Sequence, residues 1–418
     1  MHRVANLITS LLKKTERYTK TDMLYVAEGG FWLTLGRVVA TISSLLMTVI
    51  LANMVTPTVL GNYKFVASLG AIFVGFSLTG MTTAITQAVA RGYEAVYPRG
   101  FAIHLQWGTI ALLLAVGTSG YYFFQGNVDL ALAVLIVGLC IPLTQAASLY
   151  SPFFIGRKDF KSQTWYDSVF AVVPVVVTLL SLFWSTSLVS IVGFYFLSNC
   201  LTVYAIYLHS LRHFPPNDRM DGSALGYGKH LSLMNILGGI SFQLDRVLIF
   251  HYLGAAELAV YAIAQAGPQQ LRYLSKVLST IVLPKFSLRS PDELKESVPR
   301  KAWIVFLGAL PLALAYILLA PLLYHLFFPQ YEASVIYSQV FALVILFFPS
   351  MLFQQSLLAQ KQQRQLYITQ VSVPLIKIIL LAILTPLYGM WGALASIFGM
   401  EIYRFFLVVY YFNRMNPS

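Results

Sequence analysis

Charged residues are scarce in this chain, and acidic residues are the scarcest of them. Only 11% of the 418 residues are charged and 58% are hydrophobic, with 28 Lys and Arg against 16 Asp and Glu. A water-soluble domain of this length needs more polar surface than this composition supplies. Apolar runs of about 20 residues, the length that crosses a bilayer as a helix, fill most of the chain. The composition therefore excludes a soluble enzyme and indicates a polytopic membrane protein.

Motifs that carry common enzyme chemistry are also missing. The sequence has no phosphate-binding Gly-rich loop followed by Lys-Ser/Thr, no His-Glu-x-x-His and no Cys pair at metal-ligand spacing. Its two Cys residues, Cys140 and Cys200, fall in apolar segments, where Cys packs as a small apolar residue. We therefore expect a protein that is not an enzyme and that has no metal site and no cofactor.

The apolar segments predict an all-α membrane protein with twelve transmembrane helices. The predicted spans are 29–54, 66–89, 100–124, 129–153, 164–184, 187–210, 230–253, 257–283, 302–327, 334–359, 366–386 and 389–412. Every second loop is basic, and Lys64 is the single Lys or Arg expected in a loop on the other side. Because short basic loops stay in the cytoplasm, both termini are predicted to be cytoplasmic.

An internal correspondence predicts two six-helix lobes. Residues 51–63 and 249–261 match in position and character at a constant offset of 198 residues, and each stretch links the first two spans of one half. Halves with an even number of spans run in the same sense, so a pseudo-two-fold axis along the membrane normal relates them. The predicted parts are an amphipathic N-terminal arm at 1–28, an N-lobe at 29–211, a cytoplasmic linker at 212–229 and a C-lobe at 230–418.

Six cations are predicted inside the spans, where each costs about 2.5–3.5 kcal/mol in lipid on insertion scales. They are Arg37, Arg246, Arg272, Lys276, Lys377 and Arg404. Lys276 and Arg404 are near cytoplasmic ends, where a long side chain can reach the interface. Those near mid-membrane are expected to face an interior cavity or a paired anion.

Acidic residues in the spans are few: Asp245, Glu401 and, near an end, Asp167. Glu401 and Arg404 are three residues apart and are expected to pair. Asp245 is adjacent to Arg246, so the two side chains point about 100° apart and need not pair. An excess of positive charge therefore remains inside the spans.

Polar residues at helical spacing accompany these cations. The predicted polar lumen residues, beside the cations themselves, are Thr34, Thr41, Ser44, Asn235, Gln243, Gln265, Gln269, Lys276 and Gln370. Hydroxyl and amide side chains alone fit a water-filled lumen or hydrogen bonding between helices equally well. A stripe that also contains Arg or Lys favours the lumen. A desolvated cationic lumen favours an anionic ligand, since Arg binds phosphate oxygens with two parallel hydrogen bonds.

Five short stretches carry a family resemblance. They are MVTPTVLGNY at 54–63, LGAAELAVY at 253–261, GRKDF at 156–160, QLDR at 243–246 and YGMWGA at 388–393. With the order of the spans, they resemble the polysaccharide-exporter branch of the multidrug/oligosaccharidyl-lipid/polysaccharide (MOP) exporter superfamily, which includes the Wzx-type flippases of O-antigen repeat units.

This resemblance implies a flippase of the bacterial inner membrane. Such proteins move an undecaprenyl-diphosphate-linked oligosaccharide from the cytoplasmic to the outer leaflet by alternating access, for synthesis of cell-surface polysaccharide. It implies that the diphosphate binds Arg37, Arg246, Arg272 and Lys377 while the lipid tail stays in the bilayer. A proton or sodium gradient would drive transport, with Asp245 and then Asp167 as coupling candidates. The polysaccharide polymerase machinery is an expected partner, and nucleic acid is not.

Other classes share parts of this pattern. An ion-coupled exporter of another anionic or drug-like solute in the same superfamily is the alternative, although an exporter of organic cations favours carboxylates in its lumen. A major-facilitator transporter also has twelve spans in two halves, but its basic Gly-containing signature is missing from 90–100. A membrane polymerase or ligase carries a large outer loop with catalytic residues, and all predicted outer loops here are short.

Overall fold

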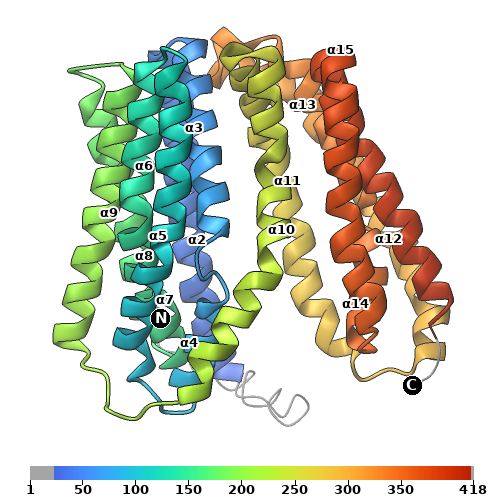
Figure 1. Ribbon diagram of the computed structural model, residues 1–418. Helices are drawn as coiled ribbons and strands as arrows, with labels where there is room; N and C mark the ends of the chain where they lie inside the picture. The colour runs from blue at the N-terminus through green and yellow to red at the C-terminus, as the bar shows by residue number, and fades with distance from the viewer. Residues whose placement is uncertain (1–22, 416–418) are drawn as a thin grey trace, which may run out of the picture. The chain divides into compact units, whose positions relative to one another are not determined.

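The computed structural model describes residues 23–415, without the side chains of residues 23–28, 234, 235, 237, 273, 274, 276, 277 and 280. Residues 23–415 contain only helices and their connections (Figure 1). The elements are α2 (Met23–Met54), α3 (Pro57–Gly75), α4 (Met81–Ala90), α5 (Val96–Phe124), α6 (Val128–Ala147), α7 (Tyr150–Gly156), α8 (Phe160–Ser181), α9 (Leu188–His213), α10 (Gly222–Leu253), α11 (Ala255–Phe286), α12 (Pro291–Phe327), η1 (Pro329–Tyr331), α13 (Ser334–Ala342), η2 (Leu343–Phe347), α14 (Ser350–Ala359) and α15 (Gln363–Asn413). The predicted arm at 1–28 lies almost wholly outside the described residues.

Ten helical segments of the described chain are long and apolar enough to cross a membrane. One of them, α15, is two helices joined at Gly389, which has φ 59° and ψ −134°. Helix α11 is also 32 residues long but carries more charge. Counting α11 and both halves of α15 accommodates the twelve predicted spans, and the predicted all-helical membrane fold is confirmed.

The second span begins earlier than the sequence suggested. Residues 66–89 were predicted to form one span, whereas α3 covers Pro57–Gly75 and the shorter α4 follows at Met81. Pro57 opens α3 directly after α2, because the fixed φ of Pro suits the first turn of a helix. The prediction that Lys64 lies in an outer loop is therefore wrong, since Lys64 lies within α3.

The described helices form two compact units. The first unit comprises residues 23–47 and Phe76–Asn235, and the second comprises Thr48–Gly75 and 236–415. The chain passes between them within α2, after α3 and within α10. Residues 48–75, which were predicted to belong to the N-lobe, thus pack with the second unit.

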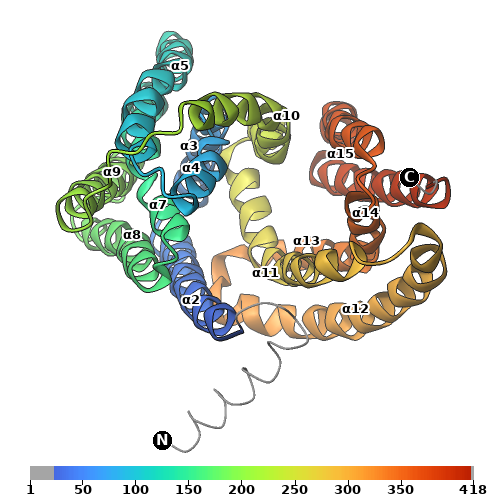
Figure 2. The same ribbon diagram turned by 90° about the horizontal axis from the view of Figure 1, so that it is seen from below.

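Helices α5, α6, α8 and α9 pack side by side in the first unit (Figures 1 and 2). Small residues allow the close contact of α5 with α6: a Cβ on Gly108 would lie 2.7 Å from the Pro142 Cα, and one on Gly138 would lie 2.2 Å from the Ala115 Cβ. Small residues at such contacts are typical of membrane helices, because they let backbones approach closely.

In the second unit, α11 packs against α3, α13 and α14, and α14 packs against α15 (Figure 2). The contact between α3 and α11 is especially close. A Cβ on Gly61 would lie 1.7 Å from the carbonyl oxygen of Ala255, so only glycine fits there without a shift of the backbone. Phe65 of α3 also stacks on Phe250 of α10, with ring centroids 3.7 Å apart.

Loops in the first unit alternate between two ends as predicted. Glu94, which follows α4, is hydrogen-bonded to Arg157, which follows α7, and to Asn217, which follows α9. The loops after the second, fourth and sixth predicted spans therefore lie at one end of this unit. We call that end the basic end.

Loops of the second unit alternate in the same way. At its basic end, Gln360 Nε2 of the α14–α15 loop donates to the Arg289 carbonyl after α11, at 2.8 Å. At the opposite end, which we call the neutral end, Asn53 Nδ2 donates to the Phe327 carbonyl at the end of α12, at 2.9 Å. The placement of the basic ends in the cytoplasm stays a prediction.

Candidate functional site

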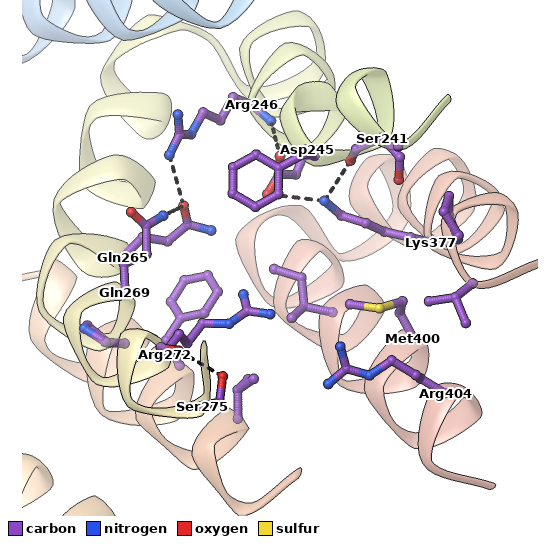
Figure 3. Close-up of a pocket in the computed structure, with 18 residues that line it drawn as sticks. Ser241, Asp245, Arg246, Gln265, Gln269, Arg272, Ser275, Lys377, Met400 and Arg404 are labelled. Atoms are coloured by element: carbon purple, nitrogen blue, oxygen red, sulfur yellow. Dashed lines mark hydrogen bonds and ion pairs between the residues drawn. The ribbon is translucent and has the colours of Figure 1, made fainter. Parts of the chain in front are cut away.

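A cavity of about 430 Å³ lies inside the second unit (Figure 3). Its wall combines α10, α11 and α15 with residues of α13 and η2. Four cations line it: Arg246, Arg272, Lys377 and Arg404. Three of the four residues predicted to bind a diphosphate thus share one cavity.

Helical periodicity directs polar residues of three helices into this cavity. Ser241 and Asp245, one turn apart on α10, both line it, as do Gln265, Gln269 and Arg272 on α11. Residues three or four apart share a face of a helix, so the spacing seen in the sequence places them on one wall. Pro268 and Pro374 also line the cavity, beside Arg272 and Lys377.

Arg246 is held by neutral groups. Its Nη1 donates to Gln243 Oε1 at 3.1 Å and its Nη2 donates to Gln265 Oε1 at 3.5 Å. Gln269 Nε2 donates to the same Gln265 oxygen at 3.0 Å. These amides orient the guanidinium group without neutralising its charge.

Lys377 is deeply buried and is paired. Its Nζ donates to the Ser241 carbonyl at 2.8 Å and lies 3.7 Å from Asp245 Oδ2. Tyr261 donates its hydroxyl hydrogen to the same carboxylate oxygen at 2.6 Å. Asp245 therefore pairs with a residue on another helix, while the adjacent Arg246 points elsewhere, in keeping with the 100° between neighbours on a helix.

Arg272 and Arg404 share one carboxylate. Arg272 Nη2 lies 3.1 Å from Glu401 Oε1, and Arg404 Nη2 pairs with the other oxygen of Glu401, whose side chain is fully buried. The predicted Glu401–Arg404 pair is thus present. Arg404 also donates to Ser350 Oγ at 3.3 Å and lines the cavity, so Glu401 holds it inward instead of letting it extend to the interface. A smaller cavity of about 160 Å³ borders Arg272, Arg404 and Ser279.

The charge balance inside the second unit is less one-sided than the sequence suggested. Lys377 and Arg272 were expected to face an interior cavity or a paired anion, and each has a carboxylate partner. Sequence spacing could not identify these partners, because they lie on other helices. Four cations face two carboxylates, Asp245 and Glu401. The site keeps two net positive charges, so it still favours an anion.

The other predicted site residues lie elsewhere. Thr34, Arg37, Thr41 and Ser44 lie on α2 within the first unit and are not part of this cavity wall. Gln370 is exposed on α15 and does not line the cavity. The side chains of Asn235 and Lys276 lie outside the described residues.

Asp167, the second coupling candidate, belongs to a polar cluster in the first unit. Tyr150 donates its hydroxyl hydrogen to Asp167 Oδ1 at 2.8 Å, and Gln163 Nε2 donates to Oδ2 at 3.1 Å. No ion pair of the described residues includes Asp167. Asp167 is therefore held by neutral donors, whereas Asp245 contacts a cation.

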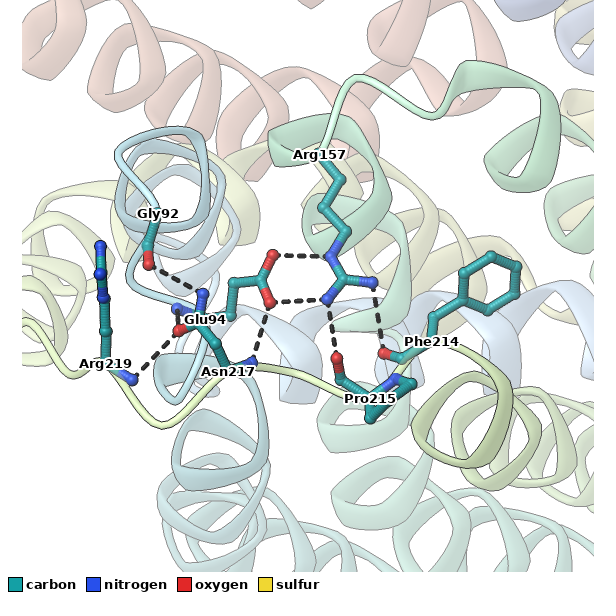
Figure 4. A network of polar contacts seen from close by, with 7 residues as sticks. All are labelled: Gly92, Glu94, Arg157, Phe214, Pro215, Asn217 and Arg219. Carbon is teal, nitrogen blue, oxygen red and sulfur yellow. Dashed lines mark hydrogen bonds and ion pairs between the residues drawn. The ribbon is translucent and has the colours of Figure 1, made fainter.

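A charged network at the basic end of the first unit fixes the start of the predicted linker (Figure 4). Arg157 binds Glu94 through two hydrogen bonds, of 2.7 Å from Nε and 2.6 Å from Nη2, and its Nη groups also donate to the carbonyls of Phe214 and Pro215. The hydrogen bonds from Arg157 hold the pKa of the Glu94 carboxyl below its ordinary value, against the opposing effect of burial. This geometry ties loops together and leaves no open cation for a ligand.

The helical fold and the charged interior cavity define a membrane transporter. The solved structures that resemble the chain include "Lipid II flippase MurJ, inward closed conformation", with TM-score 0.68, 14% identity, and coverage of 90% of this chain and 86% of that one. An inward-facing multidrug resistance MATE family transporter of the MOP superfamily has a TM-score of 0.61 and 13% identity, and the match covers 92% of this chain and 98% of that one. A MOP superfamily transporter from Pyrococcus furiosus, described as having a reverse polarity of its binding pocket, has a TM-score of 0.57 and 12% identity, and the match covers 93% of this chain and 95% of that one. At these identities the likeness shows the fold.

The family follows from the sequence match. Residues 26–288, more than half of the chain, match the family model described as "Polysaccharide biosynthesis protein". The chain belongs to this polysaccharide biosynthesis family, and its fold is that of the MOP exporters. No curated protein sequence matches it.

Proposed function

We propose that this protein is a flippase of the bacterial inner membrane that moves an undecaprenyl-diphosphate-linked oligosaccharide to the outer leaflet for cell-surface polysaccharide synthesis. Membership of the polysaccharide biosynthesis family supports the pathway, and the similarity to a lipid II flippase supports transport of a lipid-linked substrate. The two units would alternate access to the substrate, and the basic ends would face the cytoplasm.

The observation that carries this proposal is the sign of the cavity in the second unit. Among the described residues, the hydrogen bonds of the Arg246 guanidinium group go only to the neutral side chains of Gln243 and Gln265. Arg272 and Arg404 share a single carboxylate. Two uncompensated positive charges in a low-dielectric interior favour an anion that brings two or more negative charges. A diphosphate meets this requirement, and an organic cation does not.

The lipid tail imposes a second requirement. A polyprenyl chain has to stay in the bilayer while its diphosphate crosses, so the headgroup site must lie within membrane-spanning helices. The cavity lies between α10, α11 and α15, of which α10 and α15 are among the apolar candidate spans. We also propose that Arg37, on α2 of the first unit, binds the diphosphate.

Coupling to a proton or sodium gradient is part of the proposal. Asp245 and Asp167 remain the two candidate residues, and their different surroundings separate them. If Asp245 couples, Asp245→Asn abolishes export that depends on the gradient while Asp167→Asn retains it. Unchanged gradient dependence in Asp245→Asn would reject that residue, and proteoliposomes with an imposed proton or sodium gradient provide the measurement.

The central experiment removes the charge of Arg246 while keeping its ability to hydrogen-bond. In cells that depend on this protein, Arg246→Gln should lower surface polysaccharide at least about tenfold, because a charge-assisted hydrogen bond contributes roughly 1.5–3 kcal/mol. Purified Arg246→Gln should bind undecaprenyl diphosphate about tenfold more weakly than wild type. Arg37→Ala should likewise abolish export, and Arg37→Lys should retain part of it.

Arg300→Gln is the matched control, because Arg300 is an exposed residue near the start of α12. It should keep wild-type export and binding. Equal affinity of the wild-type protein for undecaprenyl diphosphate and for uncharged undecaprenol would overturn the proposed function. So would normal surface polysaccharide in cells that make only Arg246→Gln, at equal amounts of folded protein in the membrane.

A further inference from the structure

Lys64 lies on the buried face of α3, inside the second unit. Leu60 and Ser68, which lie one turn before and one turn after it on the same face, are both 0% exposed. Lys64 itself is half-buried. A buried ammonium group is costly unless an anion or polar group contacts it. The position of Lys64 on this face therefore has to be explained, whereas a lysine in a surface loop would need no explanation.

A second cation lies beside it. The stacking of Phe65 on Phe250 holds α3 and α10 side by side, and Arg246 lies one turn from Phe250 along α10. Lys64 directly precedes Phe65 in α3, so this aromatic contact places the two cations in the same region of the second unit.

No carboxylate compensates this pair among the described residues. None of their ion pairs includes Lys64 or Arg246. Asp245, the carboxylate next to Arg246 in the sequence, is engaged by Lys377 and Tyr261. Two like charges in a low-dielectric interior destabilise each other unless an anion lies between them.

The cations of the second unit also differ in depth. With a rise of 1.5 Å per residue, distances along each helix from the neutral end are about 10 Å for Lys64 and Arg246, about 18 Å for Lys377 and about 26 Å for Arg272. Arg272 has Glu401 and Lys377 has Asp245, whereas the two cations nearest the neutral end have no carboxylate. Positive charge is therefore least compensated toward the neutral end.

We propose that Lys64 and Arg246 form a second anion-binding position, which receives the diphosphate after it leaves Arg272 and Arg404 and before it exits at the neutral end. This inference rests on the proposed function. This position favours movement of a diphosphate toward the neutral end, because Lys64 and Arg246 have no carboxylate partner among the described residues, whereas Arg272 and Arg404 share Glu401. The phosphate of an anionic lipid headgroup has the same chemistry, so the test separates the two sources.

The experiment measures binding to the full-length protein in nanodiscs by native mass spectrometry, with undecaprenyl diphosphate and phosphatidylglycerol as separate probes. Lys64→Gln is expected to weaken binding of undecaprenyl diphosphate about tenfold and to lower surface polysaccharide in cells. Lys64→Arg should retain most of both, because it keeps the charge. Lys161→Gln, which changes an exposed lysine at the start of α8, is the matched control and should behave as wild type.

A double-mutant cycle tests whether the two cations bind the same anion. The effects of Lys64→Gln and Arg246→Gln should be non-additive, because residues that share one partner couple energetically. The fold loss of affinity in the double variant should therefore be smaller than the product of the fold losses in the two single variants. Size-exclusion profiles and the retention of binding by Lys64→Arg show that the variants are folded.

Three outcomes would overturn the inference. Wild-type affinity and export in Lys64→Gln would remove Lys64 from the path and leave the proposed function intact. Weaker binding of phosphatidylglycerol alone, with unchanged affinity for undecaprenyl diphosphate, would assign Lys64 to membrane lipid. Failure of the wild-type protein to bind undecaprenyl diphosphate would overturn the proposed function and this inference together.

Discussion

The two units use their charged residues differently. In the first unit, the Glu94–Arg157 pair lies at the basic end and binds loop backbone, and the half-buried carboxylate Asp167 is held by a tyrosine and a glutamine. In the second unit, Arg246 and Lys377 line an interior cavity between apolar helices. The Glu94–Arg157 pair of the first unit joins loops, whereas Arg246 and Lys377 of the second unit face a cavity.

This difference shows that the number of charges alone does not identify a binding site. The bidentate Glu94–Arg157 pair is a saturated contact, since each group meets partners that the chain itself provides. The second unit has more cations than carboxylates, and its amide partners orient Arg246 without neutralising it. An interior with unbalanced charge is stable only when water or a ligand of opposite sign compensates it.

Glu401→Gln should produce the largest effect on stability, because it removes the fully buried carboxylate that Arg272 and Arg404 share. Breaking a buried charge pair costs about 3–5 kcal/mol. We expect a lower thermal unfolding midpoint in detergent and a lower yield of monodisperse protein. Glu296→Gln, which removes an exposed carboxylate of α12, should leave both unchanged.

The double variant Glu401→Gln/Arg404→Gln sharpens this prediction. Removing one cation together with the carboxylate leaves Arg272 as the single charge, so part of the lost stability should return. If the double variant is less stable than Glu401→Gln alone, charge balance is not what Glu401 contributes, and packing around it accounts for the loss.

Gly61→Ala tests the close contact that joins α3 to the second unit. The added Cβ would lie 1.7 Å from a backbone oxygen of Ala255, so we expect a loss of roughly 1–3 kcal/mol or more from forced separation of the helices. Gly117→Ala in α5 of the first unit is the matched control, because nothing lies within 4 Å of its Cβ. The thermal unfolding midpoints of both variants provide the measurement. An equal midpoint for the two variants would contradict the close contact at Gly61.

Glu94→Gln should have the smallest effect, about 1 kcal/mol at neutral pH, because this pair is partly open to solvent. The Glu94 pKa is lowered mainly by the Arg157 hydrogen bonds, so the contribution of the ionised form is fully present above its ordinary pKa of 4.5 and is lost as pH falls below it. The difference in unfolding midpoint between wild type and Glu94→Gln should shrink below pH 4.5. A difference that is independent of pH would show that the pair contributes through packing alone.

Much of the fold was predictable because membrane helices follow a simple rule. The length of an apolar run and the position of basic loops set the spans and their alternation, and the network around Glu94 and Asn217 confirms the alternation in the first unit. The start of the second span was missed because α2 and α3 are both apolar and almost contiguous. Lys64 was misplaced for the same reason, although its spacing with Leu60 and Ser68 fits one helical face.

The sequence by itself determined that the chain is a membrane protein, the number of apolar spans, and the polar faces of α10 and α11 that line the cavity. Hydrophobic length and a period of 3.6 residues are local properties of the chain. Only the tertiary structure decided how the charges pair. Arg272 and Glu401 are 129 residues apart, and Lys377 meets the α10 backbone 136 residues away. Coulomb energy depends on distance in space, and packing between helices, such as the contact at Gly61, sets that distance.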